Sequence, residues 1–209
     1  MVITEKHSLI LQKAEELFAD KGFEGATVRD IAEAAGVNVA MISYYFGSKE
    51  KLMEVLFRER MVSVKTRLED LIASRAFTPF QKVEILIEEY VARVIEKQCF
   101  YRIMITEQVV NKNSVVLRFL KEVKFSYASL FSQLILEGQK MKLFKKDIDV
   151  MMLLTTMTGT VTQLVINKDY YREFNNYKKL KDAEFDIVLK NKLIQHVKEV
   201  FKATLGYEA

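Results

Sequence analysis

Apolar positions recur at helical spacing along the whole chain, first in short segments and then in long ones. Near the start, Ile10, Ala14 and Phe18 are each four residues apart and so lie on one face of a helix. This pattern predicts a helix over roughly residues 5–21, and Gly22 is placed to end it in a left-handed cap. The chain therefore begins with a single amphipathic helix that buries one face.

Two still shorter helices are predicted by their end signals. Thr27, followed three residues later by Asp30, forms a capping-box-like start, and Gly36 ends the helix after about two turns. Asn38 is a good N-cap for a third helix, which Gly47 ends. Four of the seven glycines lie in the first 47 residues, so helix ends are concentrated there.

The third short helix has an inner and an outer face. Ile42 and Phe46 are four residues apart and should be buried together. Tyr44 and Tyr45 are adjacent, so they cannot both occupy one narrow inner face, and Tyr45 falls at the border. The pattern predicts an outer face made of Val39, Ala40, Ser43 and Tyr44.

Long helices are predicted for the remainder. Ser48 caps a fourth helix, and Thr78 with Pro79 starts another, because proline favours the first helical turn. Further helices are expected near 99–110, 113–141, 147–167 and 184–205, whereas 167–184 is polar and aromatic and is interpreted as a long connection. No strand pattern is present, so we predict an all-α protein of about nine helices.

Charge and composition narrow the function classes. The net charge is +4, but residues 1–50 carry five basic and eight acidic side chains, a net charge of −3. A single cysteine, Cys99, excludes an internal disulfide and fits a reducing, cytoplasmic location. The two histidines, His7 and His196, lie at opposite ends of the chain. No metal-ligand spacing, nucleophile motif or phosphate-binding glycine loop is evident, so an enzyme, a metal or another cofactor is not expected.

One stretch raises the question of membrane insertion. Residues 150–166 contain no charge but include five threonines and a glutamine. Seventeen residues lie at the lower limit of what spans a bilayer. We interpret the stretch as a helix covered on both sides by protein, and we expect no membrane partner. The N-terminus has charges at Glu5 and Lys6 and no long apolar segment, so it is not expected to be a secretory signal.

Two short helices joined by a tight glycine-containing turn are typical of a helix-turn-helix, whose second helix enters the DNA major groove. The alternative is an ordinary helical hairpin whose aromatic residues belong to the core. Spacing alone leaves both open.

The segment 14–52 resembles the DNA-binding domain of the tetracycline-repressor (TetR) family of transcriptional regulators. The resemblance rests on Ala14, Leu17-Phe18, Gly22-Phe23, Thr27, Ile31-Ala32, Ala35-Gly36-Val37, Ile42, Tyr45-Phe46, Ser48-Lys49-Glu50 and Leu52. It implies a three-helix DNA-binding domain at 1–50 with its motif at 27–46, followed by a larger helical domain at 51–209 for ligand binding and dimerisation.

The resemblance also implies roles for individual residues. Side chains that approach phosphates would lie at the start of the second helix and after the third, and those that read bases would lie on the third helix. The candidates are Thr27, Val28, Arg29, Asn38, Val39, Ala40, Met41, Ser43, Tyr44, Tyr45 and Lys49. Many family members have Lys-Gly-Thr-Leu-Tyr where this chain has Val39-Ala40-Met41-Ile42-Ser43, so the usual cation at 39 and tyrosine at 43 are absent.

The resemblance further implies a homodimer formed through the helices near 147–167 and 184–205, binding double-stranded DNA at an inverted repeat. It implies a pocket in the middle helices for a largely apolar small-molecule effector. Candidate lining residues are Phe100, Tyr101, Met104, Phe125, Tyr127, Phe131, Met151 and Met157. Aromatic and methionine residues at helical spacing are equally typical of a plain core.

These observations favour a dimeric DNA-binding regulator, most often a repressor, released from its operator by a ligand. The alternative is a helical protein-interaction module of the same fold without specific DNA binding, which the missing cation at Val39 and the negative N-terminal charge would support.

Overall fold

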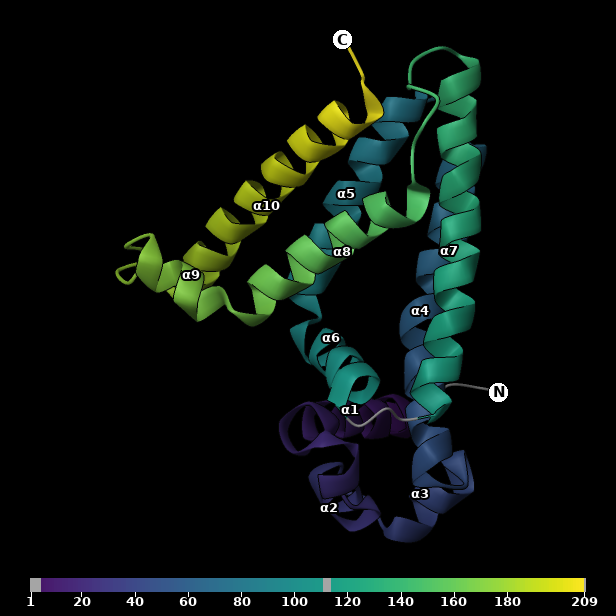
Figure 1. The fold of residues 1–209 in the computed structure, drawn as a ribbon. Helices are drawn as coiled ribbons and strands as arrows, with labels where there is room; N and C mark the ends of the chain where they lie inside the picture. Colours follow the sequence, from purple (N-terminus) through teal and green to yellow (C-terminus); the bar gives the residue numbers. More distant parts are fainter. Residues whose placement is uncertain (1–4, 111–113, 209) are drawn as a thin grey trace. The chain divides into compact units, whose positions relative to one another are not determined.

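The structure is a computed structural model, and it describes residues 5–110 and 114–208. Over these residues it contains ten α-helices, one π-helical turn and no strand, which confirms the predicted all-α class (Figure 1). The helices form two compact units, one of residues up to Lys65 with Cys99–Lys124, the other of Thr66–Gln98 with Phe125 onward.

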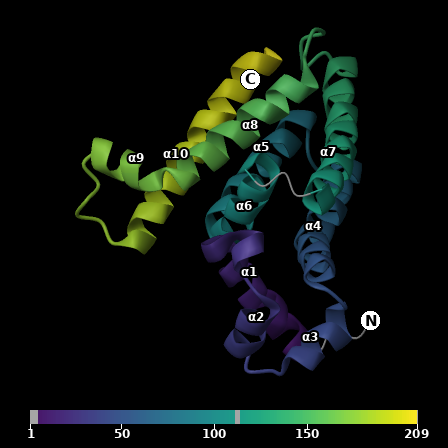
Figure 2. The same cartoon turned by 60° about the horizontal axis from the view of Figure 1, so that its bottom comes forward.

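The first unit begins with three helices whose ends are set by local signals: α1 (Glu5–Gly25), α2 (Val28–Ala34) and α3 (Val39–Phe46) (Figure 2). Gly22 breaks α1 with φ 72° and ψ 170°, so the predicted break and positive φ are at the right residue, although the ψ differs from that of a left-handed helical cap. Thr27 and Asp30 form the predicted capping box of α2. Gly36 and Gly47, both with positive φ, follow α2 and α3.

The rest of the first unit comes from distant parts of the chain. It consists of the start of α4 (Lys49–Ala73), α6 (Gln98–Ile105), the π-helical turn η1 (Thr106–Val110) and the start of α7 (Ser114–Lys140). The buried Phe57 ring lies 4.9 Å from the Phe100 ring and 5.9 Å from the Phe119 ring, measured between centroids. The unit therefore extends well past the boundary at residue 50 that the sequence predicted, because α6 and α7 supply part of its core.

The second unit contains the end of α4, α5 (Pro79–Glu96), the end of α7, α8 (Val150–Ile166), α9 (Lys168–Phe174) and α10 (Asp182–Leu205). Helices α5, α8 and α10 pack on one another. The buried stripe of α10 has the spacing of a single helix face: Phe185, Leu189, Leu193, Val197, Phe201 and Leu205. Near the end of the chain the Tyr207 ring stacks on Phe80, with centroids 3.9 Å apart.

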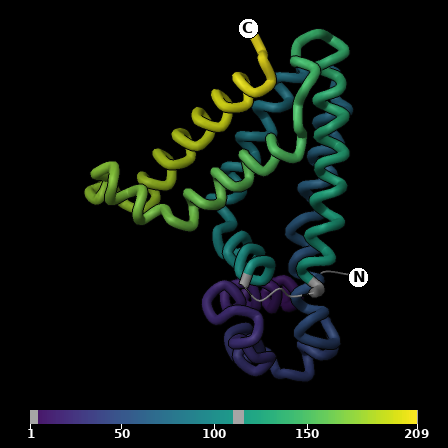
Figure 3. The backbone as a smooth tube through the Cα atoms, viewed as in Figure 1, coloured from purple at the N-terminus to yellow at the C-terminus, as the bar shows by residue number. Residues whose placement is uncertain are grey.

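One expectation for this unit was wrong. The segment 167–184 is not only a connection, because it contains α9 (Figure 3). That helix is fixed from outside: Lys168 Nζ lies 3.0 Å from Asp186 Oδ1, and Arg172 Nη1 lies 2.6 Å from Asp182 Oδ1. Within the single chain α8 is covered on one side, where Leu153, Met157, Val161 and Val165 are buried, and the covering of its opposite face by protein stays a prediction.

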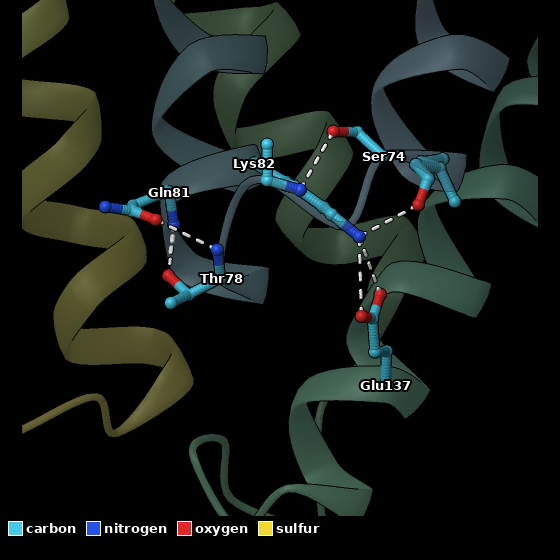
Figure 4. Close-up of polar contacts among 7 residues, drawn as sticks. Ser74, Thr78, Gln81, Lys82 and Glu137 are labelled. Atoms are coloured by element: carbon cyan, nitrogen blue, oxygen red, sulfur yellow. Dashed lines mark hydrogen bonds and ion pairs between the residues drawn. The ribbon is translucent and has the colours of Figure 1, made fainter.

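A buried cation joins three helices of the second unit (Figure 4). Lys82 of α5 is 2% exposed, and its Nζ donates to the Ile72 carbonyl of α4 at 2.8 Å. The same Nζ lies 3.1 Å from Glu137 Oε2 of α7. A buried ammonium needs such partners because removing it from water is costly. The polar contacts of Lys82 therefore fix the relative positions of α4, α5 and α7.

Within the described part of the chain, no single helix is long and apolar enough to span a membrane. Helices α8 and α9 pass the length and composition test only when taken together, and they are bent by 76° at their junction.

Candidate nucleic-acid interface

Helix α3 is short because Asn38 caps its start and Gly47 ends it. The Asn38 side chain accepts a hydrogen bond from the Met41 amide at 2.9 Å, which satisfies a donor that the first turn leaves unpaired. At the other end Gly47 has φ 79°, a conformation that L side chains rarely adopt, and its amide donates to the Ser43 carbonyl at 2.9 Å. Eight residues are thus held as one compact helix.

The two faces of α3 differ as the sequence predicted. Ile42 and Phe46 are 1% and 5% exposed, and the Phe46 ring stacks on His7 of α1 with centroids 4.7 Å apart. Tyr44 is 83% exposed, the largest value among the exposed large hydrophobic residues of the described chain, and Val39 is 41% exposed. Ala40 and Ser43 are also exposed, whereas Met41 and Tyr45 are half-buried. The outer face of α3 is therefore an accessible surface.

The start of α2 carries the candidates for phosphate contact. Thr27 and Arg29 are exposed and Val28 is half-buried. The Thr27 hydroxyl already accepts from the Asp30 amide at 3.1 Å, and the Thr27 amide donates to Asp30 Oδ2 at 2.9 Å. These bonds from the Thr27 backbone and side chain, with the charge of Lys21, hold the pKa of the Asp30 carboxyl below its ordinary value. The hydroxyl of Thr27 can still donate a hydrogen bond to a phosphate oxygen.

The Lys49 ammonium is engaged within the chain. Its Nζ donates to the Phe23 carbonyl at 2.9 Å and to the Ala26 carbonyl at 3.2 Å, and it lies 4.3 Å from the centre of the Phe23 ring. An ammonium has three donors, so one N–H is left for another acceptor. The sequence suggested a phosphate contact for Lys49, and the structure adds a second role, because Lys49 also holds the turn between α1 and α2.

Two acidic side chains of α1 are paired with nearby bases, and one of these bases, Arg60, lies outside the stretch whose net charge is −3. Glu15 is nearly buried and lies 2.7 Å from Arg60 Nη2. Glu16 lies 2.8 Å from Lys13 Nζ, and the side-chain hydrogen bond from Lys13 lowers the pKa of the Glu16 carboxyl. The negative charge of the sequence is therefore not all available to repel DNA.

The candidate effector-binding residues fall in both units. Phe100, Tyr101 and Met104 belong to the first unit, where the two aromatic residues are buried. In the second unit Phe131 and Met157 are buried and Tyr127 is half-buried. Phe125 and Met151 are 66% and 53% exposed, so they lie at the surface rather than in the interior. A pocket lined by these residues stays a prediction.

The arrangement of α2 and α3 defines the class of protein. Two capped short helices joined by a tight turn at Gly36, with an exposed outer face on the second helix, make a helix-turn-helix protein. Residues 10–56 match the family model for bacterial regulatory proteins, tetR family. The match covers α2 and α3 and the start of α4, so this segment of the chain resembles the regulatory proteins of that family.

Curated proteins that are similar to the chain are named as regulators. Over 137 residues the chain is 34% identical to the probable HTH-type transcriptional regulator YttP of Bacillus subtilis, an alignment that covers 64% of each chain. The chain thus spans just under two thirds of this relative's length. It is 27% identical over 171 residues to the fatty acid metabolism regulator protein of the same organism, covering 79% of this chain and 87% of the relative.

Solved structures share the fold. The ketosteroid transcriptional regulator KstR2 of Mycobacterium tuberculosis superposes with a TM-score of 0.72 over 96% of both chains at 20% identity. The transcriptional regulator FadR of Bacillus subtilis, solved in complex with stearoyl-CoA, superposes with a TM-score of 0.66 at 23% identity, covering 91% of this chain and 97% of FadR. The predicted helical architecture is confirmed, and the predicted resemblance to the family is confirmed over residues 10–56.

The sequence pattern did not indicate that Glu107 contributes to the first unit near the candidate interface. Glu107 in η1 is 1% exposed, and its Oε1 accepts a hydrogen bond from the Phe23 amide at 3.1 Å. The two residues are 84 positions apart, so no local pattern could have paired them.

Proposed function

We propose that the protein is a cytoplasmic transcriptional regulator that binds an inverted-repeat DNA operator as a homodimer and is released by a largely apolar small molecule. The observation that carries the proposal is the outer face of α3, where Tyr44 is 83% exposed while Ile42 and Phe46 of the same helix are buried. A large aromatic side chain held in water on a rigid, capped helix is suited to meet a partner surface. In a helix-turn-helix protein that partner is the major groove.

The residues of α3 would divide the reading of bases among them. Tyr44 and Ser43 carry hydroxyls that donate to or accept from base edges, and Val39 and Ala40 offer apolar contact to a thymine methyl. The Asn38 oxygen is already used as the helix cap. Asn38 therefore keeps its amide N–H groups for DNA and is suited to donate to a base acceptor rather than to make a bidentate contact with adenine.

Contacts to phosphate would set the register of α3 in the groove. The exposed Arg29 and the Thr27 hydroxyl at the start of α2 are on one side of the motif, and Tyr45 and the remaining N–H of Lys49 are on the other. The number of such groups is small. We expect a modest salt dependence, with log K falling by about 0.9 per phosphate contacted for each tenfold rise in salt.

The exposed face of α8 supports the dimer. It carries no charge and combines small, threonine and apolar residues: Met152, Thr155, Thr156, Gly159, Gln163 and Ile166. Nothing lies within 4 Å of a Cβ built on Gly159, which leaves room for a second helix to approach closely. A two-fold dimer through α8 and α10 would present two copies of α3 to two half-sites, which multiplies specificity.

The effector is proposed to be largely apolar, and an acyl-coenzyme A is the first class to test. The support is the similarity to the Bacillus subtilis fatty acid metabolism regulator protein. A ligand releases DNA only to the extent that it binds the non-binding conformation more tightly than the binding one. Titrating stearoyl-CoA into the protein–DNA complex should lower DNA affinity, and free coenzyme A is the control for the acyl chain.

The proposed function is tested by DNA binding. A duplex selected by the wild-type protein from a random library, and a random duplex of equal length, are titrated at two salt concentrations. Tyr44→Ala should cost about 1–3 kcal/mol on the selected duplex and relax base preference, with little effect on the random duplex. Tyr170→Ala is the matched control, because Tyr170 is 72% exposed on α9 of the second unit.

Arg29→Gln should weaken binding to both duplexes by a similar factor, as loss of a phosphate contact does. Arg29 is a better phosphate test than Lys49, since Lys49 also donates to the Phe23 and Ala26 carbonyls and its loss would disturb the fold. If the wild-type protein selects no sequence and binds DNA no better than the Tyr44→Ala variant, the protein-interaction module becomes the better description.

A further inference from the structure

The turn that follows the break in α1 is held by two charged side chains from other parts of the first unit. Gly22 is not helical, so the chain restarts a helical turn at Phe23, whose amide lacks a partner in the preceding helix. Glu107 Oε1 accepts that N–H at 3.1 Å. Lys49 Nζ donates to the Phe23 and Ala26 carbonyls of the same turn at 2.9 and 3.2 Å.

The Glu107 contact is buried and therefore strong. Glu107 is 1% exposed and Phe23 is 4% exposed, so water does not compete for the hydrogen bond. A carboxylate that accepts from the first amides of a helical turn also interacts favourably with the positive end of the helix dipole. Glu107 thus caps a helical turn that lies 84 positions earlier in the chain.

The element that carries Glu107 is unusual. Residues Thr106–Val110 form a π-helical turn directly after α6, and such turns are rare and occur often at functional sites. They are also less favourable than an α-helix, so a π-helical turn is a place where the backbone can change its hydrogen bonding at low cost. Glu107 is therefore attached to an element that can shift.

The held turn leads directly into the reading head, the pair of helices α2 and α3. Thr27, the N-cap of α2, comes immediately after Ala26, whose carbonyl Lys49 binds. Lys49 itself begins α4 three residues after Phe46, the last residue of α3. The hydrogen bonds of Glu107 and Lys49 thus connect η1, through the turn at Phe23–Ala26, to the pair of helices that would meet DNA.

We propose that Glu107 is a positioning residue for DNA reading: its carboxylate locks the turn at Phe23 to η1, and Lys49 locks the same turn to the start of α4. A displacement of η1 that withdraws the carboxylate frees the turn and changes the orientation of α2 and α3. This inference rests on the proposed function as a DNA-binding dimer. It assigns the coupling between η1 and the helices α2 and α3 to the side chain of Glu107.

The test uses the full-length dimer and three substitutions. Glu107→Leu removes the acceptor, Glu107→Gln keeps an acceptor oxygen at the same reach, and Glu107→Asp withdraws the carboxylate by one methylene. Gln108→Leu is the matched control, because the neighbouring Gln108 accepts from Lys124 Nζ of α7 at 2.7 Å. The probes are the selected inverted-repeat duplex and a duplex that holds only one half-site.

A positioning role predicts a difference between the two probes. Glu107→Leu should weaken binding to the inverted repeat on the order of tenfold, the loss expected for a hydrogen bond to a charged group, and weaken half-site binding only about threefold, because the inverted repeat engages two loosened heads and the half-site one. Glu107→Gln should restore most of the loss, and Glu107→Asp should lie between. Equal losses on both probes, or no loss on either, would overturn the proposal.

A second measurement needs no DNA and separates this proposal from the proposed function. Amide hydrogen exchange should speed up in Phe23–Ala26 and in α2 and α3 of Glu107→Leu, or of Glu107→Asp if the leucine variant does not fold, while Gln108→Leu matches the wild type. Unchanged exchange there sinks the positioning role even if the protein binds DNA. Faster exchange in a protein that selects no DNA sequence would sink the proposed function and leave the coupling intact.

Discussion

Helices α3 and α10 are positioned in opposite ways. Helix α3 has eight residues, buries only Ile42 and Phe46, and is delimited by the Asn38 side chain and by Gly47. Helix α10 has 24 residues and buries six apolar side chains along one stripe. A helix that is fixed at its ends leaves most of its surface for a partner, whereas a helix fixed along its length uses that surface for the core.

The two units also differ in the buried charged side chain that joins distant segments in each. In the first unit Glu107 accepts from a backbone amide, and in the second unit Lys82 donates to the Ile72 carbonyl and to Glu137. Lys82 joins the long helices α4, α5 and α7, whereas Glu107 joins the short turn η1 to the end of α1. Substitutions in the second unit should therefore change global stability most, and those in the first unit should change function at smaller cost.

The largest effect is expected from Glu137→Leu. The substitution leaves the Lys82 ammonium, which is 2% exposed, with only the Ile72 carbonyl, and an uncompensated buried charge costs about 3–5 kcal/mol. Lys82→Met should cost less, about 1–2 kcal/mol, because the Glu137 side chain is 42% exposed and stays hydrated. Urea unfolding measures both. A larger loss for Lys82→Met than for Glu137→Leu would refute this account of the pair.

Gly138→Ala probes packing in the same unit. A Cβ on Gly138 would lie 2.1 Å from Cδ2 of Phe144, a ring that is itself 5% exposed and 6.4 Å from the Tyr207 ring. Relieving this overlap should cost about 1–3 kcal/mol of unfolding free energy, although alanine is the better helix former. Ser129→Ala, at an exposed position of the same helix, is the control and should be close to neutral in the same urea titration.

Asn38 tests whether the reading helix depends on its cap. Asn38→Ala should lower the unfolding free energy by about 1 kcal/mol, whereas Asn38→Asp keeps the acceptor for the Met41 amide and should be nearly neutral. DNA affinity should fall in both, because each variant lacks the amide donor. If Asn38→Asp destabilises the protein as much as Asn38→Ala, the cap is not what holds the start of α3.

The smallest effect concerns the capping box of α2. The pKa of Asp30 is lowered in the folded protein, so its carboxylate adds stability above the unfolded pKa of about 3.9. This contribution is lost as pH falls below that value through the folded pKa. Asp30→Asn keeps an acceptor but does not titrate, so its stability should decline less than that of wild type on acidification below about pH 4. If the unfolding free energies of Asp30→Asn and wild type fall in parallel with pH, the Asp30 carboxylate does not contribute to stability in this way.

Local signals predicted much of the fold, because caps act over three or four residues. Thr27, Asn38 and Thr78 were each recognisable as helix starts, and each is the observed N-cap. Helix α9 was missed because it buries no residue and so has no apolar period. Its position depends on contacts such as Lys168 with Asp186, 18 residues away.

The candidate DNA-binding surface was predictable for the same local reason. The outer face of α3 follows from the spacing of Ile42 and Phe46, and the structure exposes Tyr44 as expected. The double role of Lys49 and the contact of Glu107 were not predictable, because their partners lie 23 to 84 positions away and the hydrogen bonds go to backbone atoms that have no sequence signature.

Because Phe57 packs against Phe100 and Phe119, the reading head cannot be transplanted as one contiguous stretch. A chimaera cut after residue 57 would separate Phe57 from Phe100 and Phe119 and would leave behind the carboxylate that secures Phe23. An engineer who wants a new operator preference should recode individual positions on α3 in place. Recombination between relatives is constrained in the same way, so new specificities should arise in this lineage through point changes rather than through exchange of whole modules.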